Sequence, residues 1–271
     1  MKSLENKKIL ITGGASGIGY LIVKMAAQER AHVIIFDVVQ KKLDEVSKEL
    51  ASHGYSISTY YCDVSNKEMI YEKAKKVQDE IGDIDILINN AGVVQGKFFA
   101  DYSDQEIQKT IEINTIAHFW LLKAFLPSMI QRNQGHIVTL SSAAGTVGVS
   151  KLSIYCATKF AVFGFNESLR QEFRIKNLNI KTTVVCPYYI NTGMFAGVKT
   201  RFPLLLPILK QEKVAKKIIQ GIKKEKEQIV MPFIVKVTWV FRILPIKIFD
   251  WISSFLGVNA SMDDFAGKGK K

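Results

Sequence analysis

Cysteine, histidine and proline are scarce in this chain of 271 residues, which holds three cysteines, four histidines and six prolines. Cys62, Cys156 and Cys186 are scattered and odd in number, which argues against a disulfide framework and fits a reducing cytosol. The histidines show no metal-ligand spacing, so we expect no metal site. No low-complexity run interrupts the first 230 residues, so we expect disorder only at the ends.

Long apolar segments are also lacking at the start of the chain. Residues 1–6 contain no apolar run ahead of the first strand, so we expect neither a signal peptide nor an N-terminal anchor. The formal net charge of +12 permits binding to nucleic acid or anionic lipid. The lysines are spread through helical segments without a recognition motif, and we therefore expect no nucleic-acid partner. We expect a cytoplasmic protein, with peripheral membrane association left open.

A glycine turn follows the first apolar strand, residues 7–12, and precedes a helix over residues 20–30. Glycines at such a turn let backbone N–H groups and the helix N-terminus approach a pyrophosphate, although a tight turn with close helix packing would use them too. We predict that the turn binds a dinucleotide cofactor through Gly13, Ser16, Gly17, Ile18 and Gly19.

An acidic residue ends the second strand, residues 32–36. Asp37 stands where a dinucleotide fold places an acid on the adenosine ribose. A carboxylate there accepts hydrogen bonds from ribose hydroxyls and repels a 2′-phosphate. This favours NAD as the cofactor, whereas Lys41 and Lys42 leave NADP open.

Two further strand ends supply candidate cofactor contacts. Asp63 and Val64 follow the strand of residues 56–61, and Asp63 either accepts from the adenine amino group or caps the next helix. The apolar strand of residues 84–88 is typical of a strand buried on both faces, and it runs into two asparagines and two small residues. Small residues let the chain pass close to a ribose, so we predict contacts from Asn90, Ala91 and Gly92.

Four side chains carry the predicted chemistry. A capping box at Ser103 and Glu106 predicts a helix through residue 129, in which Asn114 is either a kink or an amide facing the cleft. The strand of residues 135–142 delivers Ser142 at its end. A helix over residues 153–176, opened by a Ser153 cap, places Tyr155 and Lys159 on one face because they are four apart.

The Tyr-x-x-x-Lys spacing recurs at Tyr20 and Tyr71, so the preceding Ser142 must distinguish the catalytic pair. A phenol acting as base near neutral pH needs its pKa lowered from about 10 to about 7. An ammonium at about 4 Å supplies energy of that order. We predict that Tyr155 exchanges the alcohol proton, Ser142 binds the substrate oxygen, and Lys159 tunes Tyr155 and holds a ribose hydroxyl. The hydride requires a cofactor.

Strands and helices alternate along the chain, which predicts an α/β fold: a single Rossmann-like, doubly wound parallel sheet of about seven strands flanked by helices. We expect residues 1–232 to form the dinucleotide-binding and catalytic domain, with an apolar lid at about 188–210. Residues 233–271 would form an apolar and basic C-terminal helical extension. Its charges and Pro245 interrupt the length that a transmembrane helix needs, so we favour an interfacial helix pair over a helix packed on the core or a dimer partner.

Together these motifs resemble the short-chain dehydrogenase/reductase family over essentially the whole chain to about residue 232. The glycine turn, residues 89–92 and the 13-residue step from Ser142 to Tyr155 carry the resemblance. It implies catalytic roles for Asn114, Ser142, Tyr155 and Lys159, and a homodimer built on the helices that follow Asn114 and carry Tyr155. It also places Pro187 at the cofactor, and Ile190 and Thr192 at the nicotinamide amide.

One departure from the family pattern narrows the resemblance. The usual Pro-Gly after the sixth strand is Pro187-Tyr188 here, a variant that resembles the retinol and 17β-hydroxysteroid dehydrogenase branch, nearest to epidermal retinol dehydrogenases. The branch implies NAD-dependent hydride transfer with a hydrophobic alcohol or ketone of retinoid, steroid or long-chain type. An NADP-linked ketoreductase of acyl or keto intermediates and a non-catalytic nucleotide-binding or lipid-surface scaffold are the alternatives.

Overall fold

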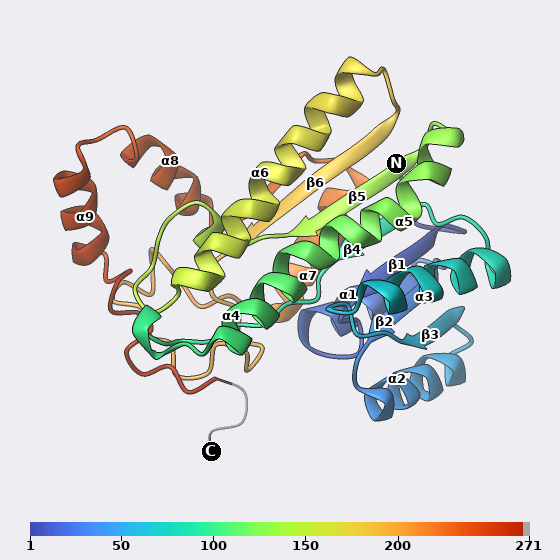
Figure 1. The fold of residues 1–271 in the computed structure, drawn as a ribbon, viewed down its shortest axis with the longest axis horizontal. Coiled ribbons are helices and arrows are strands. Elements are labelled where there is room, and N and C mark those ends of the chain that lie inside the picture. The colour runs from blue at the N-terminus through green and yellow to red at the C-terminus, as the bar shows by residue number, and fades with distance from the viewer. Residues whose placement is uncertain (268–271) are drawn as a thin grey trace.

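The computed structural model describes residues 1–267. Within them, seven parallel strands form one sheet in the order β3-β2-β1-β4-β5-β6-β7 (Figure 1). The strands are β1 (Lys8–Thr12), β2 (His32–Asp37), β3 (Ile57–Tyr61), β4 (Ile86–Asn89), β5 (Gly135–Leu140), β6 (Ile180–Pro187) and β7 (Gln228–Met231). The predicted doubly wound parallel sheet is therefore confirmed. The strand order reverses between β1 and β4, where open α/β sheets bind ligands.

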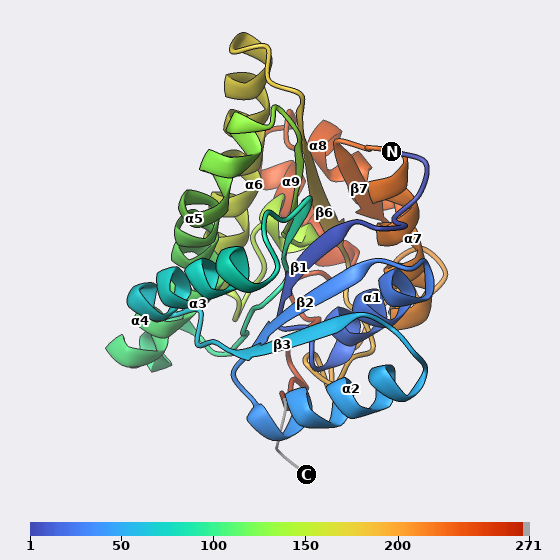
Figure 2. The ribbon, with the colours of Figure 1, turned by 90° about the vertical axis from the view of Figure 1, so that its right-hand side faces the viewer.

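Helices cover both faces of the sheet (Figure 2). One layer contains α1 (Gly17–Gln28), α2 (Gln40–Ser52) and α7 (Gln211–Lys223). The other contains α3 (Lys67–Glu80), α4 (Asp104–Ile111), α5 (Ala117–Gln131) and α6 (Ser153–Ile175). Alternate residues of each strand serve the two layers: Ile9 and Ile11 pack beneath α1, and Leu10 packs on the opposite side. The central strands β1 and β4 are mostly apolar because both of their faces are buried.

Two helix boundaries differ from the sequence prediction. The Ser103–Glu106 capping box is present, but the helix after it is interrupted by a π-helical segment, Glu112–Ile116, before α5 begins. Ser153 is the first residue of α6 and not its cap, because Leu152 occupies the N-cap position without a side-chain bond. Tyr155 and Lys159 nevertheless lie one turn apart on this helix, as predicted.

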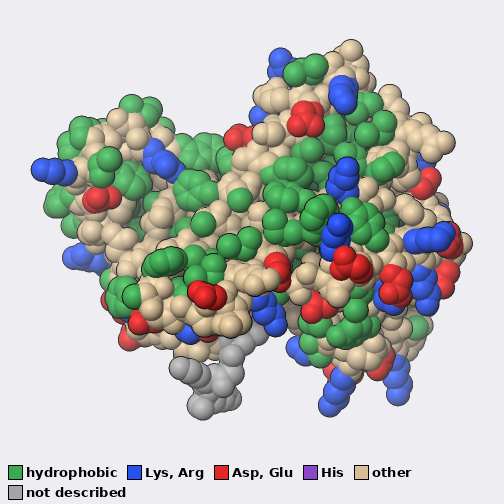
Figure 3. Space-filling view, viewed as in Figure 1, with side chains coloured by type: hydrophobic (Ala, Val, Ile, Leu, Met, Phe, Trp, Pro, Cys, Tyr) green, Lys and Arg blue, Asp and Glu red, His purple; other side chains and the backbone are tan. Residues whose placement is uncertain are grey.

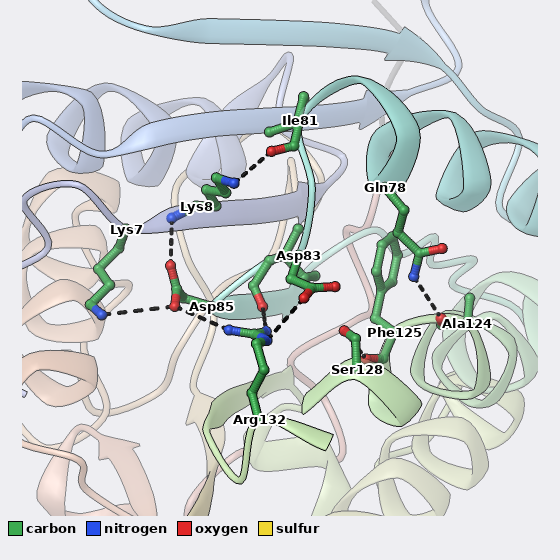
Figure 4. Close-up of polar contacts among 11 residues, drawn as sticks. Lys7, Lys8, Gln78, Ile81, Asp83, Asp85, Ala124, Phe125, Ser128 and Arg132 are labelled. Atoms are coloured by element: carbon green, nitrogen blue, oxygen red, sulfur yellow. Dashed lines mark hydrogen bonds and ion pairs between the residues drawn. The ribbon is translucent and has the colours of Figure 1, made fainter. Parts of the chain in front are cut away.

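Charged side chains tie the strands together at their amino ends (Figure 4). Arg132, just after α5, donates to the Ile84 carbonyl oxygen at 2.7 Å and lies 3.2 Å from the Asp83 carboxylate. Asp85 accepts from the Lys8 backbone N–H at 3.0 Å. These contacts join the amino ends of β1 and β4 to the end of α5. The loops that build the site lie at the opposite, carboxyl ends of the strands.

The C-terminal extension folds back as a separate lobe beside α6 (Figure 1). It contains a 3₁₀ turn (Phe233–Lys236), α8 (Val237–Phe241) and α9 (Ile246–Phe255). Val235 is buried, whereas Ile243 and Trp251 are 84% and 66% exposed. The lobe thus packs on the core with one side and exposes apolar side chains on the other. Within residues 1–267, no helix combines the length and the apolar character needed to cross a membrane.

Candidate active site

The glycine turn between β1 and α1 lies against the end of β4. A Cβ atom at Gly19 would collide with the Gly13 carbonyl oxygen and approach Asn90 Nδ2 to 2.7 Å, and Gly13 itself has a φ of +65°. Asn90 Nδ2 donates to the Thr12 carbonyl oxygen at 2.8 Å. The surface at this point is therefore made of backbone and small side chains, a shape that suits a pyrophosphate group.

Both predicted acidic residues lie at strand ends, but each already has backbone partners. Asp37, 8% exposed, accepts from the Ala15 N–H of the glycine turn at 3.0 Å and from the Val39 N–H at 3.1 Å. Asp63 accepts from the Ser65 N–H and hydroxyl at 2.9 and 2.7 Å. Asn66 caps α3, so Asp63 organises the preceding turn and is not the helix cap.

Asn114 lies in the π-helical segment and is fully buried. Its amide exchanges two hydrogen bonds with the backbone of Val93, both 2.8 Å long, and contacts the Thr158 hydroxyl at 3.3 Å. The kink interpretation is therefore confirmed: the helix is distorted at Asn114, and its amide pairs with the loop after β4 and does not line the cleft. Asn114 joins that loop to α6, and its Oδ1 lies beside Gly92.

Ser142, Tyr155 and Lys159 come together at the end of β5. Ser142 Oγ accepts from the Ala144 N–H at 3.1 Å and donates to the Pro187 carbonyl oxygen at 3.4 Å. Lys159 Nζ donates to the Leu140 carbonyl oxygen at 2.8 Å and lies 5.5 Å from the centre of the Tyr155 ring. Tyr155 and Lys159 are 6% and 4% exposed, so both groups are held away from bulk water.

Burial is the largest influence on the pKa values of Tyr155 and Lys159. It lowers the pKa of Lys159 to about 8 and raises the pKa of Tyr155, with the Ser142 side chain acting on Tyr155 in the opposite direction. We predicted a lowered Tyr155 pKa from the nearby ammonium. In the protein alone the loss of water around the phenol is the larger effect, because desolvation favours the neutral form of each group.

A cleft of about 160 Å³ runs over the ends of β1, β4, β5 and β6. The predicted cofactor residues that line it are Gly13, Ser16, Gly17, Ile18, Gly19, Asn90, Ala91, Gly92, Tyr155, Lys159, Pro187, Ile190 and Thr192. Asp37, Asp63, Val64 and Asn114 are not part of this lining. The sequence reasoning did not select Leu140, Ser141, Tyr188, Met194 and Phe195, which also line it. Their adjacency to Ser142, Pro187 and Thr192 was the available signal.

A second cavity, about 240 Å³, adjoins this cleft and shares four residues with it: Ser142, Tyr155, Tyr188 and Phe195. Its wall is almost entirely apolar. The predicted lid contributes Leu205 and Leu206, among others. The C-terminal extension contributes Ile234, Val235, Thr238, Phe241, Ile252, Leu256 and Val258. Sequence reasoning treated the extension as separate from the site and missed this contribution.

The side chains between the cleft and the apolar cavity can exchange a proton with a bound molecule. Two hydroxyls, those of Ser142 and Tyr155, stand at the junction of a backbone-lined cleft and an apolar cavity. The buried amine of Lys159 lies beside the phenol. A polar atom of a molecule in the cavity can therefore exchange a proton with a side chain that also borders the cleft.

Comparison with known proteins agrees with this geometry. Residues 7–201 match the short chain dehydrogenase family. The chain is 43% identical over 273 residues to epidermal retinol dehydrogenase 2 of Mus musculus, covering all of this chain and 88% of that protein. It is 41% identical over 246 residues to estradiol 17-beta-dehydrogenase 11 of Homo sapiens, covering 90% of this chain and 81% of that protein.

Solved structures share the fold. A short chain dehydrogenase/reductase from Burkholderia phymatum in complex with NAD superposes with a TM-score of 0.80 at 23% identity, covering 90% of this chain and 96% of the other. A metagenomic short-chain oxidoreductase in complex with NADP gives a TM-score of 0.70 at 26% identity, with coverages of 84% and 95%. This chain therefore belongs to the short-chain dehydrogenase family and is an oxidoreductase related to retinol and steroid dehydrogenases.

Proposed function

We propose that this protein is an NAD-dependent dehydrogenase that acts on a hydrophobic alcohol or ketone of retinoid, steroid or long-chain type. The observation that carries the proposal is the junction of the cleft and the apolar cavity at Ser142 and Tyr155. A lipophilic molecule in the cavity would present its oxygen to these hydroxyls. The relatives named as retinol and estradiol dehydrogenases support the same substrate class.

The cofactor residues fit a dinucleotide. The glycine turn, with Gly13 and Gly19 packed too closely for side chains, is suited to the pyrophosphate. Ile190 and Thr192 would contact the nicotinamide end, and Asn90, Ala91 and Gly92 the adjoining ribose. Asp37, held by the glycine turn itself, supports NAD because a buried carboxylate repels a 2′-phosphate. When bound, NAD would accept the hydride from an alcohol, and NADH would donate it to a carbonyl group.

The side chains at the junction would handle the proton. Burial keeps the Tyr155 phenol protonated, which suits it to donate a proton to a carbonyl oxygen. In the reverse direction the phenol must lose its proton, and the Lys159 ammonium stabilises the resulting phenolate. Ser142 would donate a hydrogen bond to the substrate oxygen, and Asn114 would hold the loop after β4 against α6.

Turnover with a panel of lipophilic alcohols tests the proposal. Purified protein is mixed with NAD, and separately with NADP, and each alcohol is screened for the absorbance of the reduced cofactor. We expect turnover with NAD, and weaker binding of NADP because of Asp37. Silence with both cofactors across retinoid, steroid and long-chain alcohols contradicts the proposed function. Preference for NADP contradicts the role given to Asp37.

We also propose peripheral membrane contact through the outer side of the C-terminal extension. Val240, Ile243, Ile246 and Trp251 are exposed there, with Lys247 next to Ile246, and this combination suits an anionic lipid surface. The double variant Ile243→Glu/Trp251→Glu is expected to stop sedimenting with anionic liposomes. Ile175→Glu, at an equally exposed isoleucine at the end of α6, is the control and should still sediment. Equal sedimentation of both variants contradicts the contact.

A homodimer through α5 and α6 is the remaining part of the proposal. Figure 3 shows hydrophobic side chains gathered over these helices. Phe119 and Phe165 pair there with ring centres 4.6 Å apart, and both remain partly exposed. Light scattering should give the mass of a dimer for the wild type and of a monomer for Phe165→Glu. A monomeric wild type at micromolar concentration contradicts the assignment.

A further inference from the structure

One side chain at the junction has no part in the roles proposed above. Tyr188 lines both the cleft and the apolar cavity, together with Ser142, Tyr155 and Phe195. Three of these four residues carry a hydroxyl group, and Tyr188 is the one without an assigned task. It follows Pro187, where the family pattern has glycine. This chain therefore places a phenol where that pattern has no side chain.

The ring of Tyr188 is held firmly in place. Its backbone N–H donates to the Met231 carbonyl oxygen at 2.7 Å, which fixes the residue at the end of β6 beside β7. Its ring packs against that of Tyr189, with centres 4.7 Å apart and planes at 63°. The packed ring of Tyr189 and the paired backbone restrict the Tyr188 side chain in the absence of a ligand.

The hydroxyls of the two neighbouring tyrosines differ in what they bind. Tyr189 Oη lies 2.8 Å from Ser261 Oγ. Tyr188 Oη has no hydrogen-bond partner among residues 1–267, and it is not one of the sealed polar atoms of the interior. Tyr188 is only partly buried, so water reaches this hydroxyl in the free protein. A molecule bound in the cavity can replace that water as the hydrogen-bond partner of the phenol.

The hydrogen bonds of the other polar groups in the cavity wall support the same conclusion. Thr238, on the far side, already donates to the Val235 carbonyl oxygen at 2.6 Å. The hydroxyls of Ser142, Tyr155 and Tyr188 all border the cleft. Ser142 donates only a long bond, 3.4 Å, to the Pro187 carbonyl oxygen, which a ligand can replace. Burial raises the pKa of Tyr188, so its phenol keeps its proton and acts as a donor at neutral pH.

We propose that Tyr188 is a substrate-positioning residue whose hydroxyl donates a hydrogen bond to the oxygen of the lipophilic alcohol or carbonyl substrate, beside Ser142 and Tyr155. The inference rests on the proposed dehydrogenase function and names a further residue of that site. An oxygen-bearing end of the substrate is thereby held at the junction, and an oxygen-free molecule of the same shape gains nothing from Tyr188.

Tyr188→Phe tests this role because it removes the hydroxyl and keeps the ring. For a lipophilic alcohol that the wild type oxidises, we expect KM to rise about threefold to tenfold, the loss of one hydrogen bond. The dissociation constant of NADH and the pH profile of kcat should not change. Tyr61→Phe is the matched control, since Tyr61 lies on the edge strand β3 and is 42% exposed.

A ligand without oxygen separates positioning from packing. The hydrocarbon analogue of the same alcohol should inhibit Tyr188→Phe as well as it inhibits the wild type, because it never used the hydroxyl. An unchanged KM for the alcohol overturns the proposal. So does an equal loss for the hydrocarbon, which indicates a packing defect, or a parallel loss for NADH, which assigns the hydroxyl to the cofactor.

If no alcohol in the panel is turned over, the proposed function is contradicted. The role of Tyr188 in ligand binding can still be tested. Dissociation constants of the alcohol and its hydrocarbon analogue are then measured on the protein with NADH, by quenching of the cofactor fluorescence. Tyr188→Phe should weaken the alcohol alone by the same about threefold to tenfold. Equal effects on both ligands, or on neither, overturn the inference.

Discussion

Tyr155 and Lys159 illustrate what a local motif says about single residues and what it leaves open. Their spacing correctly placed both groups on α6 beside Ser142. The direction of the Tyr155 pKa shift was predicted wrongly for the protein alone, because it depends on how much water the lid and the extension exclude. The burial of Tyr155 depends on the complete fold, so it cannot be predicted from the spacing of Tyr155 and Lys159 alone.

His118 gives a prediction at the same scale. It is buried on α5 without a hydrogen-bond partner for either ring nitrogen among residues 1–267, and burial lowers its pKa from 6.5 to about 3. Between these pH values the unfolded chain binds a proton that the folded protein does not. The free energy of unfolding therefore falls as pH drops below about 6.5, by up to about 1.4 kcal/mol per pH unit for this group.

His118→Leu should flatten the fall of the urea midpoint between pH 6.5 and pH 4. Some slope should persist, because burial also lowers the pKa of His136, to about 4. His53→Leu is the control, since His53 is exposed at the end of α2. The same acid sensitivity in His118→Leu and the wild type would rule out His118 as a source of it.

At the scale of elements, the apolar strands and the glycine turn were predicted within a few residues because their signals are local. The distortion at Asn114 was only one of two interpretations of the sequence, because the partner of its amide, Val93, lies 21 residues away. Ser153 was misassigned as a cap. In the structure α6 begins at Ser153 itself, and Leu152 occupies the cap position without a side-chain hydrogen bond.

Gly19→Ala should damage both stability and cofactor binding, because its Cβ would collide with the Gly13 carbonyl oxygen. Overpacking of this kind costs about 1–3 kcal/mol, and it pushes the turn out of the shape that we assign to the pyrophosphate. Thermal unfolding and NADH titration measure the two effects. Gly164→Ala in α6 is the control: nothing lies within 4 Å of its Cβ, so helix propensity should raise the melting temperature. Wild-type NADH affinity in Gly19→Ala would contradict the assignment.

The C-terminal strap, residues 258–266, crosses the predicted lid. Ala266 N–H donates to the Ala196 carbonyl oxygen at 2.9 Å, and Lys199 pairs with Asp264 at 2.8 Å. Met262 is 1% exposed and packs with Phe265 against Gly96. The buried methionine should hold the strap more firmly than the ion pair, because exposed pairs contribute about 0–1 kcal/mol and a buried Met→Ala change costs about 2–5 kcal/mol.

Met262→Ala should therefore expose residues 191–200 to proteolysis much faster than Asp264→Asn does, because it removes the contact that anchors the strap. Limited digestion with mass spectrometry locates the cleavage, and the melting temperature reports global stability. Similar cleavage rates in the two variants would show that the strap is held by charge, or that it does not cover the lid in solution.

At the scale of the whole molecule, the family motifs identify the sheet and the cleft, but the apolar cavity could not be predicted. Its wall combines the loop after β5, the lid and the extension, and these segments meet only because the chain folds back after β7. The sequence predicted short apolar helices with interleaved charges in the extension. It did not reveal that one side of them closes the cavity while the other remains exposed.

The central claim is that the Tyr155 hydroxyl exchanges the substrate proton, whereas cofactor binding depends on the other residues of the cleft. The most direct test measures, on wild type and Tyr155→Phe, NADH binding by fluorescence and NAD-dependent oxidation of a lipophilic alcohol by absorbance. Turnover should fall by about a hundredfold to ten thousandfold, the usual contribution of a general acid–base group. NADH affinity should change by less than about tenfold, the most that one lost hydrogen bond accounts for. A variant that keeps its turnover, or that loses NADH along with it, would contradict the account.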